Sequence, residues 1–297
     1  MDVDQSIPNT GQSTALAADA KAALADCERR PGAPKQDPIL IATGVRRHFG
    51  GITAVDVDHL EVQRHSITAL IGPNGAGKTT LFNLLTGFDT PDEGAWTFNG
   101  HAMHKVQPHR TAKLGMVRTF QLTKSLTRLS VIENMRLGAM DQIGEKWWNG
   151  IVPARWRAQE DRITQRAEEL LRRFKLDHMR DEYAGALSGG QRKLLEMARA
   201  LMTDPSLVML DEPMAGVNPA LKQSLNDHIR GLRDQGMTVL FVEHDMDMVH
   251  DVSDWVIVMA EGRVIAEGTP EDISRNPEVI DAYLGSHQGQ SLLDGME

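Results

Sequence analysis

The sequence contains a single cysteine, Cys27, among 297 residues. One thiol cannot form an internal disulfide framework, and it cannot supply the several thiolates of a cysteine-based metal site. Long apolar runs are also missing, because none approaches the roughly 18 consecutive apolar residues of a membrane-spanning helix. If the protein works at a membrane, we expect another chain to span it.

Positive charge is scarce as well. The chain has 32 Lys and Arg residues against 41 Asp and Glu residues, and a formal net charge of -9. Bulk charge of this sign repels a polyanion, so we expect no nucleic-acid partner. The first residues are acidic and polar rather than basic and apolar, which argues against a secretory signal. The length corresponds to about two domain equivalents at ~150 residues each.

Short apolar runs alternate with longer amphipathic segments from residue 39 onward. Strands are predicted at 38–42, 54–60, 66–71, 96–100, 207–210, 238–242 and 255–259, and helices at 79–86, 189–202, 219–235 and 246–251. Strands that alternate with helices favour a mainly parallel α/β sheet. The first two strands, with a turn at Gly50-Gly51, indicate a small antiparallel sheet. A mainly helical block around residues 122–185 reads as an insertion.

The first 37 residues have a different composition, rich in Ala, Asp, Gln, Ser and Pro. Residues 15–25 favour one helical stretch, which Pro31-Gly32-Ala33-Pro34 ends. Such a composition offers little apolar surface for a core. We therefore expect residues 1–37 to form a disordered or loosely docked extension.

The run Gly72-Pro73-Asn74-Gly75-Ala76-Gly77-Lys78-Thr79 matches the P-loop pattern G-x-x-x-x-G-K-[ST] between a predicted strand and helix. Its glycines let successive N–H groups face inward, where the helix dipole adds positive potential. Lys78 supplies a charge for the β- and γ-phosphates, and the Thr79 hydroxyl can ligate Mg²⁺. The predicted ATP contacts here are Asn74, Gly75, Ala76, Gly77, Lys78, Thr79 and Thr80.

Two carboxylates follow the apolar residues 207–210. A buried strand of an α/β sheet places ligand groups at its carboxyl end. Asp211 is therefore the candidate Mg²⁺ ligand, and Glu212 the candidate base that polarises the attacking water. Alone, such a pair is more often a solvated strand end, but the P-loop reverses that preference.

Leu187-Ser188-Gly189-Gly190-Gln191 places a serine and two glycines at the start of a predicted helix. This start offers a second anion-binding helix end on the same chain. A glycine-rich turn that only caps a helix would explain the run, but not its position just before the strand that ends at Asp211. The run resembles the LSGGQ signature of ATP-binding-cassette (ABC) proteins, and residues 191–201 resemble the helix that follows it.

The resemblance covers about residues 39–285. It implies an α/β P-loop NTPase cassette with ATP and Mg²⁺ as cofactors, and a second cassette, a copy or a paralogue, bound head-to-tail. Ser188, Gly189, Gly190 and Gln191 of one subunit would then close over the γ-phosphate held by the other. It also implies a core with an antiparallel β subdomain at 38–121 and 186–285, a helical signature subdomain at 122–185 and a flexible tail at 286–297.

Other positions match the same family. Gln121 resembles the Q-loop glutamine that senses Mg²⁺ and the γ-phosphate, and His244 resembles the switch histidine. Phe49 lies where the family stacks an aromatic ring on adenine, although a core role is nearly as plausible. Asn218 stands at the D-loop position where most cassettes have Asp, and an asparagine keeps the hydrogen-bonding capacity of that position but not its charge.

Motifs that are more specific than those of the whole family resemble the ATPases of branched-chain amino-acid uptake systems. It rests on residues 72–87, 117–121, 131–134, 215–219, 242–246, 268–271 and 282–285, and the insert at 141–161 resembles the larger ATPase subunit of such systems. The ATPases of lipid or lipopolysaccharide exporters share many of these motifs, so export of such molecules remains the alternative function. A non-transport ABC ATPase is less favoured, because the chain shows neither a long coiled coil nor a second P-loop.

The transporter reading implies partners as well. They are transmembrane permease subunits, a second ATPase subunit and, for an importer, a substrate-binding protein. The chain would lie peripherally on the cytoplasmic face of the inner membrane. Trp147 and Trp148 would contact the permease or form a local core.

Overall fold

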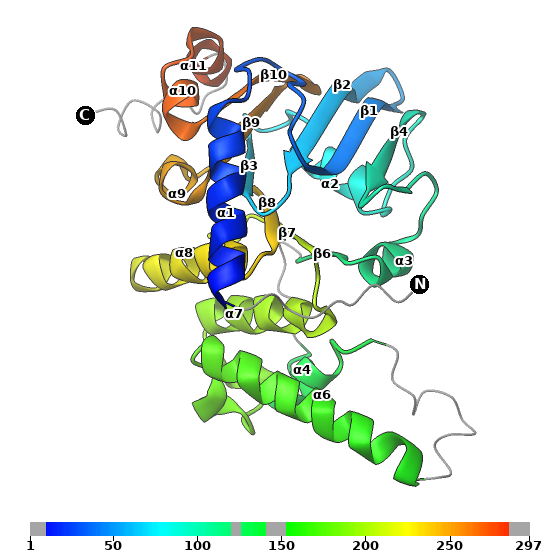
Figure 1. The fold of residues 1–297 in the computed structure, drawn as a ribbon, viewed down its shortest axis with the longest axis vertical. Helices are drawn as coiled ribbons and strands as arrows, with labels where there is room; N and C mark the ends of the chain where they lie inside the picture. Colours follow the sequence, from blue (N-terminus) through cyan, green and yellow to red (C-terminus); the bar gives the residue numbers. More distant parts are fainter. Residues whose placement is uncertain (1–9, 120–125, 141–152, 285–297) are drawn as a thin grey trace.

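The computed structural model describes residues 10–119, 126–140 and 153–284 (Figure 1). The strands are β1 (Pro38–Phe49), β2 (Ile52–Gln63), β3 (Ile67–Ile71), β4 (Glu93–Phe98), β5 (His101–Ala102), β6 (Met116–Arg118), β7 (Leu207–Asp211), β8 (Thr238–Val242), β9 (Trp255–Ala260) and β10 (Arg263–Gly268). The helices are α1 (Thr10–Ala25), α2 (Lys78–Leu85), α3 (Pro108–Lys113), α4 (Val131–Arg136), α6 (Pro153–Arg173), α7 (Gly189–Ala200), α8 (Pro219–Arg233), α9 (Met246–Val252), α10 (Pro270–Ser274) and α11 (Pro277–Leu284).

The larger sheet has the strand order β10-β9-β3-β8-β7-β6. All its neighbouring strands are parallel except β10 and β9. Every residue of β3, β7 and β8 is buried, which explains why these strands read as unbroken apolar runs rather than as alternating ones. The parallel order places the carboxyl ends of β3, β8, β7 and β6 at one edge of the sheet.

The smaller sheet is antiparallel, with the order β2-β1-β4-β5. Its hairpin turns at Gly50 and Gly51 between the paired residues Phe49 and Ile52, as the sequence predicted. Gly50 has a φ of 59°, a conformation that glycine adopts without a steric penalty. The α/β class, the mainly parallel sheet and the small antiparallel sheet expected from the sequence are therefore confirmed.

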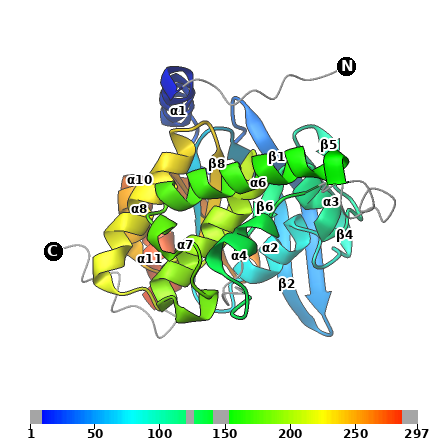
Figure 2. The same cartoon turned by 90° about the horizontal axis from the view of Figure 1, so that it is seen from below.

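Helices α4, α6 and α7 form a separate layer beyond the sheets (Figures 1 and 2). Their buried side chains include Val131, Leu170, Leu171 and Leu195, and these belong to the same hydrophobic cluster as the core of the larger sheet. The subdomain boundaries at 121/122 and 185/186 stay predictions. Within the described ranges, no helix has the length and apolar content needed to cross a bilayer.

The N-terminal segment differs from the expectation of a loosely docked extension over residues 10–37. Helix α1 buries Ala17, Ala20 and Leu24, and Figure 2 shows it at the periphery of the molecule. The composition hid this packing because most of the buried α1 side chains are small alanines, and Leu24 is the one large apolar side chain among the three. The expected tail at 286–297 lies outside the described residues.

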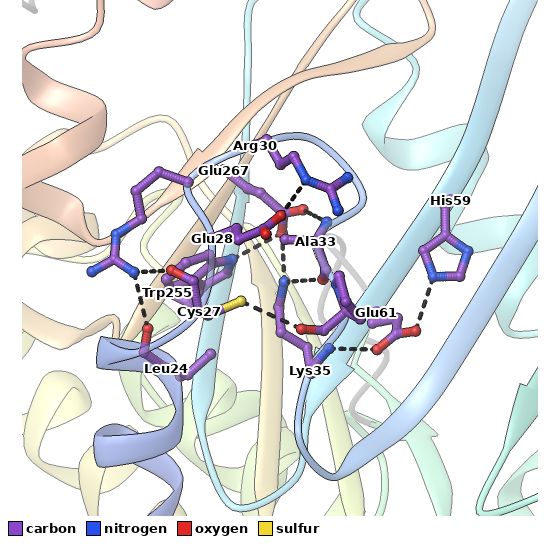
Figure 3. Close-up of polar contacts among 12 residues, drawn as sticks. Leu24, Cys27, Glu28, Arg30, Ala33, Lys35, His59, Glu61, Trp255 and Glu267 are labelled. Carbon is purple, nitrogen blue, oxygen red and sulfur yellow. Dashed lines mark hydrogen bonds and ion pairs between the residues drawn. The ribbon is translucent and has the colours of Figure 1, made fainter.

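A buried ion pair fastens the segment that follows α1 (Figure 3). The Nζ atom of Lys35 lies 2.9 Å from Oε2 of Glu267 on β10, and both side chains are almost fully buried. Glu267 also accepts hydrogen bonds from the Ala33 N–H at 2.7 Å and the Trp255 Nε1–H at 2.9 Å. The Lys35 N–H donates to Glu61 of β2 at 2.7 Å. We call residues 26–37 the N-terminal strap, because they join the edges of both sheets.

Candidate nucleotide site

The P-loop leaves the carboxyl end of β3 and enters α2 through a backbone that only glycine fits at two points. A Cβ atom on Gly72 would lie 2.0 Å from the Met259 carbonyl oxygen, and one on Gly77 would lie 2.2 Å from that of Ala54. Both glycines also have positive φ angles, of 146° and 95°. These close contacts hold the loop against β9 and β2 and fix its curl.

The outer side of the same loop is open. Gly75 has a φ of 81°, and a Cβ built on it would meet no atom within 4 Å. The first N–H groups of α2 have no intrahelical acceptor, and Gly77 at the N-cap provides no side-chain cap. Asn74 and Thr79 are exposed beside them. An open glycine loop before a helix N-terminus fits a phosphate group.

Lys78 points back over this loop. Its Nζ donates to the carbonyl oxygens of Gly72 at 2.6 Å and Pro73 at 2.9 Å. Burial lowers the pKa of Lys78, while the charges of Glu212 and Asp211 act in the opposite direction. The ammonium therefore lies within the field of the carboxylates at the end of β7, and the sheet brings together the P-loop and acidic pair that the sequence predicted separately.

Asp211 forms an ion pair that the sequence reasoning missed. Arg118, at the end of β6, donates from Nη2 to Asp211 Oδ2 at 2.6 Å, and both side chains are buried. Its Nη1 donates to Asn83 on α2 at 2.6 Å. Arg118 thus links the P-loop helix to the carboxyl end of β7. No local pattern announces this role, because the three residues belong to three separate elements.

Glu212 follows in a strained backbone conformation. Its φ of 46° lies in the left-handed region, which is uncommon for a residue other than glycine. Its N–H donates to the Val242 carbonyl of β8 at 3.0 Å, and its carbonyl accepts from Ala215 N–H at 3.1 Å. Strain of this kind persists only where the surroundings hold the residue, and it often marks functional sites.

His244 is the second residue after the adjacent strand β8, and its side chain is 59% exposed. The neighbouring Glu243 points inward and was not among the predicted site residues. Its carboxylate accepts from Met214 N–H at 2.7 Å and from the His244 N–H at 3.1 Å. Burial raises the pKa of Glu243, and these amide hydrogen bonds oppose the rise. Glu243 therefore ties the end of β8 to the loop after Glu212.

The signature run begins α7 with a capping box. The Ser188 side chain accepts from Gln191 N–H at 3.3 Å, and the Gln191 side chain accepts from Ser188 N–H at 2.9 Å. A Cβ on Gly189 would meet nothing within 4 Å, whereas one on Gly190 would lie 2.3 Å from Leu221 Cδ1. The helix start is thus open on one side. Helices α7 and α2 lie in different layers of the molecule (Figure 1).

Three further predicted positions have separate outcomes. Phe49 is half exposed at the hairpin end, with the Arg47 guanidinium 4.7 Å from its ring centroid, so it is not a core residue. Asn218 caps α8, where its side chain accepts from Leu221 N–H at 3.0 Å. Gln121 lies outside the described residues, as do Trp147 and Trp148.

The C-terminal helix also reaches the P-loop. Tyr283 of α11 is buried, and the backbone N–H of Gly72, at the start of the P-loop, favours the charged form of its phenol and so acts to lower its pKa. Burial raises the pKa of this phenol above its usual range. The sequence ending was noted only for its likeness to other chains, and this contact gives it a structural role.

Comparisons with known proteins agree with this geometry. Residues 55–215 match the family model described as ABC transporter, and residues 263–288 match that of the branched-chain amino acid ATP-binding cassette transporter. The chain is 42% identical over 252 residues to a probable branched-chain amino acid transport ATP-binding protein, LivG, of Archaeoglobus fulgidus. The match covers 85% of this chain and 97% of that protein.

A second relative is the high-affinity branched-chain amino acid transport ATP-binding protein BraF of Pseudomonas aeruginosa. It is 39% identical over 251 residues, which cover 84% of this chain and 98% of that protein. Among solved structures, a nucleotide-free ATP-binding cassette from an ABC transporter aligns with a TM-score of 0.73 and 36% identity. That alignment covers 83% of this chain and 98% of the other.

The fold, the P-loop and these matches lead to one assignment. The core sheet carries the P-loop run and an acidic pair at one edge, and the relatives are aligned over nearly their whole length. The chain belongs to the ABC transporter family, as an ATP-binding subunit that hydrolyses ATP for transport.

Proposed function

We propose that the chain powers the import of branched-chain or related amino acids. The relatives at 42% and 39% identity support this, because both are named for branched-chain amino acid transport. The match at residues 263–288 supports it independently, since it covers β10, α10 and α11 rather than the P-loop core. These findings favour import over the lipid or lipopolysaccharide export that the sequence left open.

ATP binds along the P-loop in this proposal, with its phosphates on the backbone of residues 74–77 and the first turn of α2, which includes Thr80. Lys78 turns from the carbonyl oxygens of Gly72 and Pro73 toward the phosphates, and Phe49 packs against the adenine. The Thr79 hydroxyl, Gln121 and Asp211 hold Mg²⁺, whose charge stabilises the phosphate oxygens. The open face at Gly75 and the carboxylate at Asp211 fit these groups.

In this proposal, hydrolysis depends on the residues at the carboxyl ends of β7 and β8. Glu212 accepts a proton from the attacking water, which makes its oxygen a better nucleophile. The exposed ring of His244 contacts the γ-phosphate from the end of the neighbouring strand. Asp211 would hold the metal ion rather than act as the base.

Two cassettes meet head-to-tail, and each completes the other's site. Ser188, Gly189, Gly190 and Gln191 begin a helix in a different layer from the P-loop of the same chain, so they serve the partner's γ-phosphate. The partner is a second copy or a paralogue. Binding of ATP closes this dimer, and hydrolysis reopens it.

Transmembrane permease subunits receive the motion through the helical layer. A cavity of about 270 Å³ at its surface is lined by Leu129, Glu133, Arg136 and Leu137. Leu126 and Leu137, which are half exposed, offer apolar contact beside it. The chain thus lies peripherally on the cytoplasmic face of the inner membrane. A substrate-binding protein delivers the amino acid to the permease.

Uptake by native cells tests the substrate. Cells that lack this chain should lose accumulation of labelled leucine, and the parent chain should restore it, whereas Glu212→Gln, which preserves the fold, should not. Unchanged leucine uptake together with altered membrane lipid would replace import with export. Co-purification with the permease from native membranes would identify the partner subunits.

A further inference from the structure

The turn after β7 is held from two sides. Glu243, the residue that follows β8, accepts the Met214 N–H at 2.7 Å, which fixes the turn from the side of the sheet. From the other side, Lys193 of α7 donates from Nζ to the carbonyl oxygens of Glu212 at 2.9 Å and Pro213 at 3.0 Å. Between these two contacts lies the left-handed residue Glu212, with its φ of 46°.

The Lys193 head group is placed by charge as well as by hydrogen bonds. Burial lowers its pKa, whereas the carboxylates of Glu243, Glu196 and Glu212 act in the opposite direction. A charged donor makes stronger hydrogen bonds to carbonyl oxygens than a neutral one. Lys193 is therefore suited to hold two carbonyl groups of a strained turn at once.

The contact between α7 and the turn combines these polar contacts with apolar packing, since Met197 of α7 and Met214 of the turn belong to one hydrophobic cluster. A cavity of about 20 Å³ lies between them, lined in part by Lys193, Glu196, Asp211 and Thr119. This volume holds about one water molecule. The Lys193 hydrogen bonds are the contacts that pass a displacement of α7 directly to the carbonyl groups of Glu212 and Pro213.

Helix α7 is also the helix that begins at the signature. Ser188 caps it, and Lys193 follows five residues later on the same continuous helix. At 1.5 Å per residue, the two positions are separated by less than about 8 Å along the axis. A helix this short moves as a rigid body, so movement at Ser188 also moves Lys193.

We propose that Lys193 is a positioning residue that couples the signature helix to Glu212 of its own chain. When the partner's nucleotide engages Ser188, α7 shifts, and Lys193 carries that shift to the carbonyl groups of Glu212 and Pro213. The base in one site thereby responds to occupancy of the other. This inference rests on the proposed roles of Glu212 as base and of Ser188 as a contact in trans.

Steady-state kinetics provide the first test. Lys193→Met keeps most of the side-chain length but removes the donor, and kcat should fall about 10- to 100-fold, as for ångström-scale misplacement of a reacting group. KM for ATP should change little, because Lys78 and the P-loop remain intact. Lys193→Arg should recover most of the rate, since its guanidinium can donate to both carbonyl oxygens.

The matched control is Lys35→Met, which removes another buried lysine far from the nucleotide edge. It should lower the melting temperature and leave kcat of the folded protein unchanged. If Lys193→Met behaves in the same way, Lys193 is only a structural residue and the proposal is wrong. If Lys193→Met does not fold, Lys193→Gln, which keeps an amide N–H donor, provides the same comparison of kcat with melting temperature.

Mixed dimers separate action within a chain from action across the interface. When Lys193→Met chains are mixed with Ser188→Arg chains, the proposal places both lesions in one composite site and leaves the other site intact. Activity should then partly return. If Lys193 served only the partner's nucleotide, each site would carry one lesion and the mixture would stay inactive, which would overturn the proposal.

Two reference measurements test the proposed function separately from the coupling through Lys193. A mixture of Lys78→Ala and Ser188→Arg chains should regain activity if sites are shared, whatever Lys193 does. Glu212→Gln should be inactive if Glu212 is the base. Failure of either result contradicts the proposed function, whereas success of both with an unaffected Lys193→Met contradicts only the coupling through Lys193.

Discussion

Two buried ion pairs hold opposite edges of the larger sheet. Lys35 and Glu267 pair at the β10 edge with side-chain exposures of 1% and 2%, and Arg118 and Asp211 pair at the β6 side with 6% and 4%. Their burial is nearly the same, but their surroundings differ. This comparison separates a contact that holds the fold from one that belongs to the chemistry.

At the N-terminal strap, fixed groups surround the charges. Glu267 accepts from Lys35, from the Ala33 N–H and from Trp255, and Lys35 also donates to the Ala33 carbonyl at 2.7 Å. The Lys35 ammonium lies 4.8 Å from the centroid of the Trp255 ring. A buried pair with its hydrogen bonds satisfied in this way has little reason to exchange partners.

At the nucleotide edge, the charges have more than one possible partner. Arg118 is shared between Asp211 and Asn83, and the charge of Asp211 also reaches Lys78. A carboxylate among several cations can accept a metal ion when the arrangement of charges changes. Similar burial therefore surrounds charges with fixed partners in one region and with shared partners in the other.

The largest effect is expected at the nucleotide edge. Glu212→Gln should lower kcat for ATP hydrolysis by about 10²- to 10⁴-fold, because it removes the general base. The melting temperature should stay close to that of the parent. Gln has nearly the same volume as Glu, and the hydrogen bonds that hold the turn are made to its backbone groups. Activity assays and calorimetry measure the two outcomes. Parent-like hydrolysis would transfer the base role elsewhere, with His244 as the first candidate.

The strap should give the reverse result. Lys35→Met leaves the buried carboxylate of Glu267 without its counter-charge and should cost about 3–5 kcal/mol of unfolding free energy. Chemical denaturation measures the loss, and hydrolysis by the folded fraction should be unchanged. Arg30→Met, which removes an exposed cation from the same strap, is the control and should have a small effect. Equal stability of the two variants would mean that the strap does not fasten the fold.

A third pair sharpens the comparison through its dependence on pH. Asp254 accepts from Arg233 and from the Ile67 N–H, each at 2.8 Å, yet burial raises its pKa above the ordinary value of 3.8. A raised folded-state pKa contributes stability below pH 3.8 that is lost as the pH rises through the folded-state value.

The parent should therefore lose stability relative to Asp254→Asn as the pH rises from below 4 toward 7. The change should be smaller than that for Lys35→Met, because Arg233 remains partly solvated. Urea denaturation of both proteins across this range measures the difference. A relative gain of stability by the parent with rising pH would show that the attraction of Arg233 outweighs the cost of burial.

Much of the fold was predictable because its signals are local. Continuous apolar runs predicted β3, β7, β8 and β9, and glycines predicted the P-loop and the first hairpin. The short strand β6 and the edge strand β10 were missed, since three residues or a half-exposed run carry too little pattern. The helix at residues 10–25 was partly foreseen, but its packing was not.

The candidate site likewise contains residues that the sequence predicted and residues that it did not. Sequence alone identified the P-loop, the acidic pair and the signature, because each is a contiguous run whose chemistry depends on neighbouring backbone groups. Arg118, Lys193, Glu243 and Tyr283 were assigned no role, because each acts on a residue in another element. Their partners follow from the strand order and from the position of α7, which no single run encodes.

The sequence by itself determined the glycine loop before α2, the buried strands of the larger sheet and the capping box that begins α7. Tertiary structure alone decided which charges meet. Lys35 pairs with Glu267 across 232 residues, whereas Lys193 reaches the carbonyl of Glu212 across 19. The physical reason is that backbone conformation depends on near neighbours, while a buried charge is stable only where the fold brings its partner within a few ångströms.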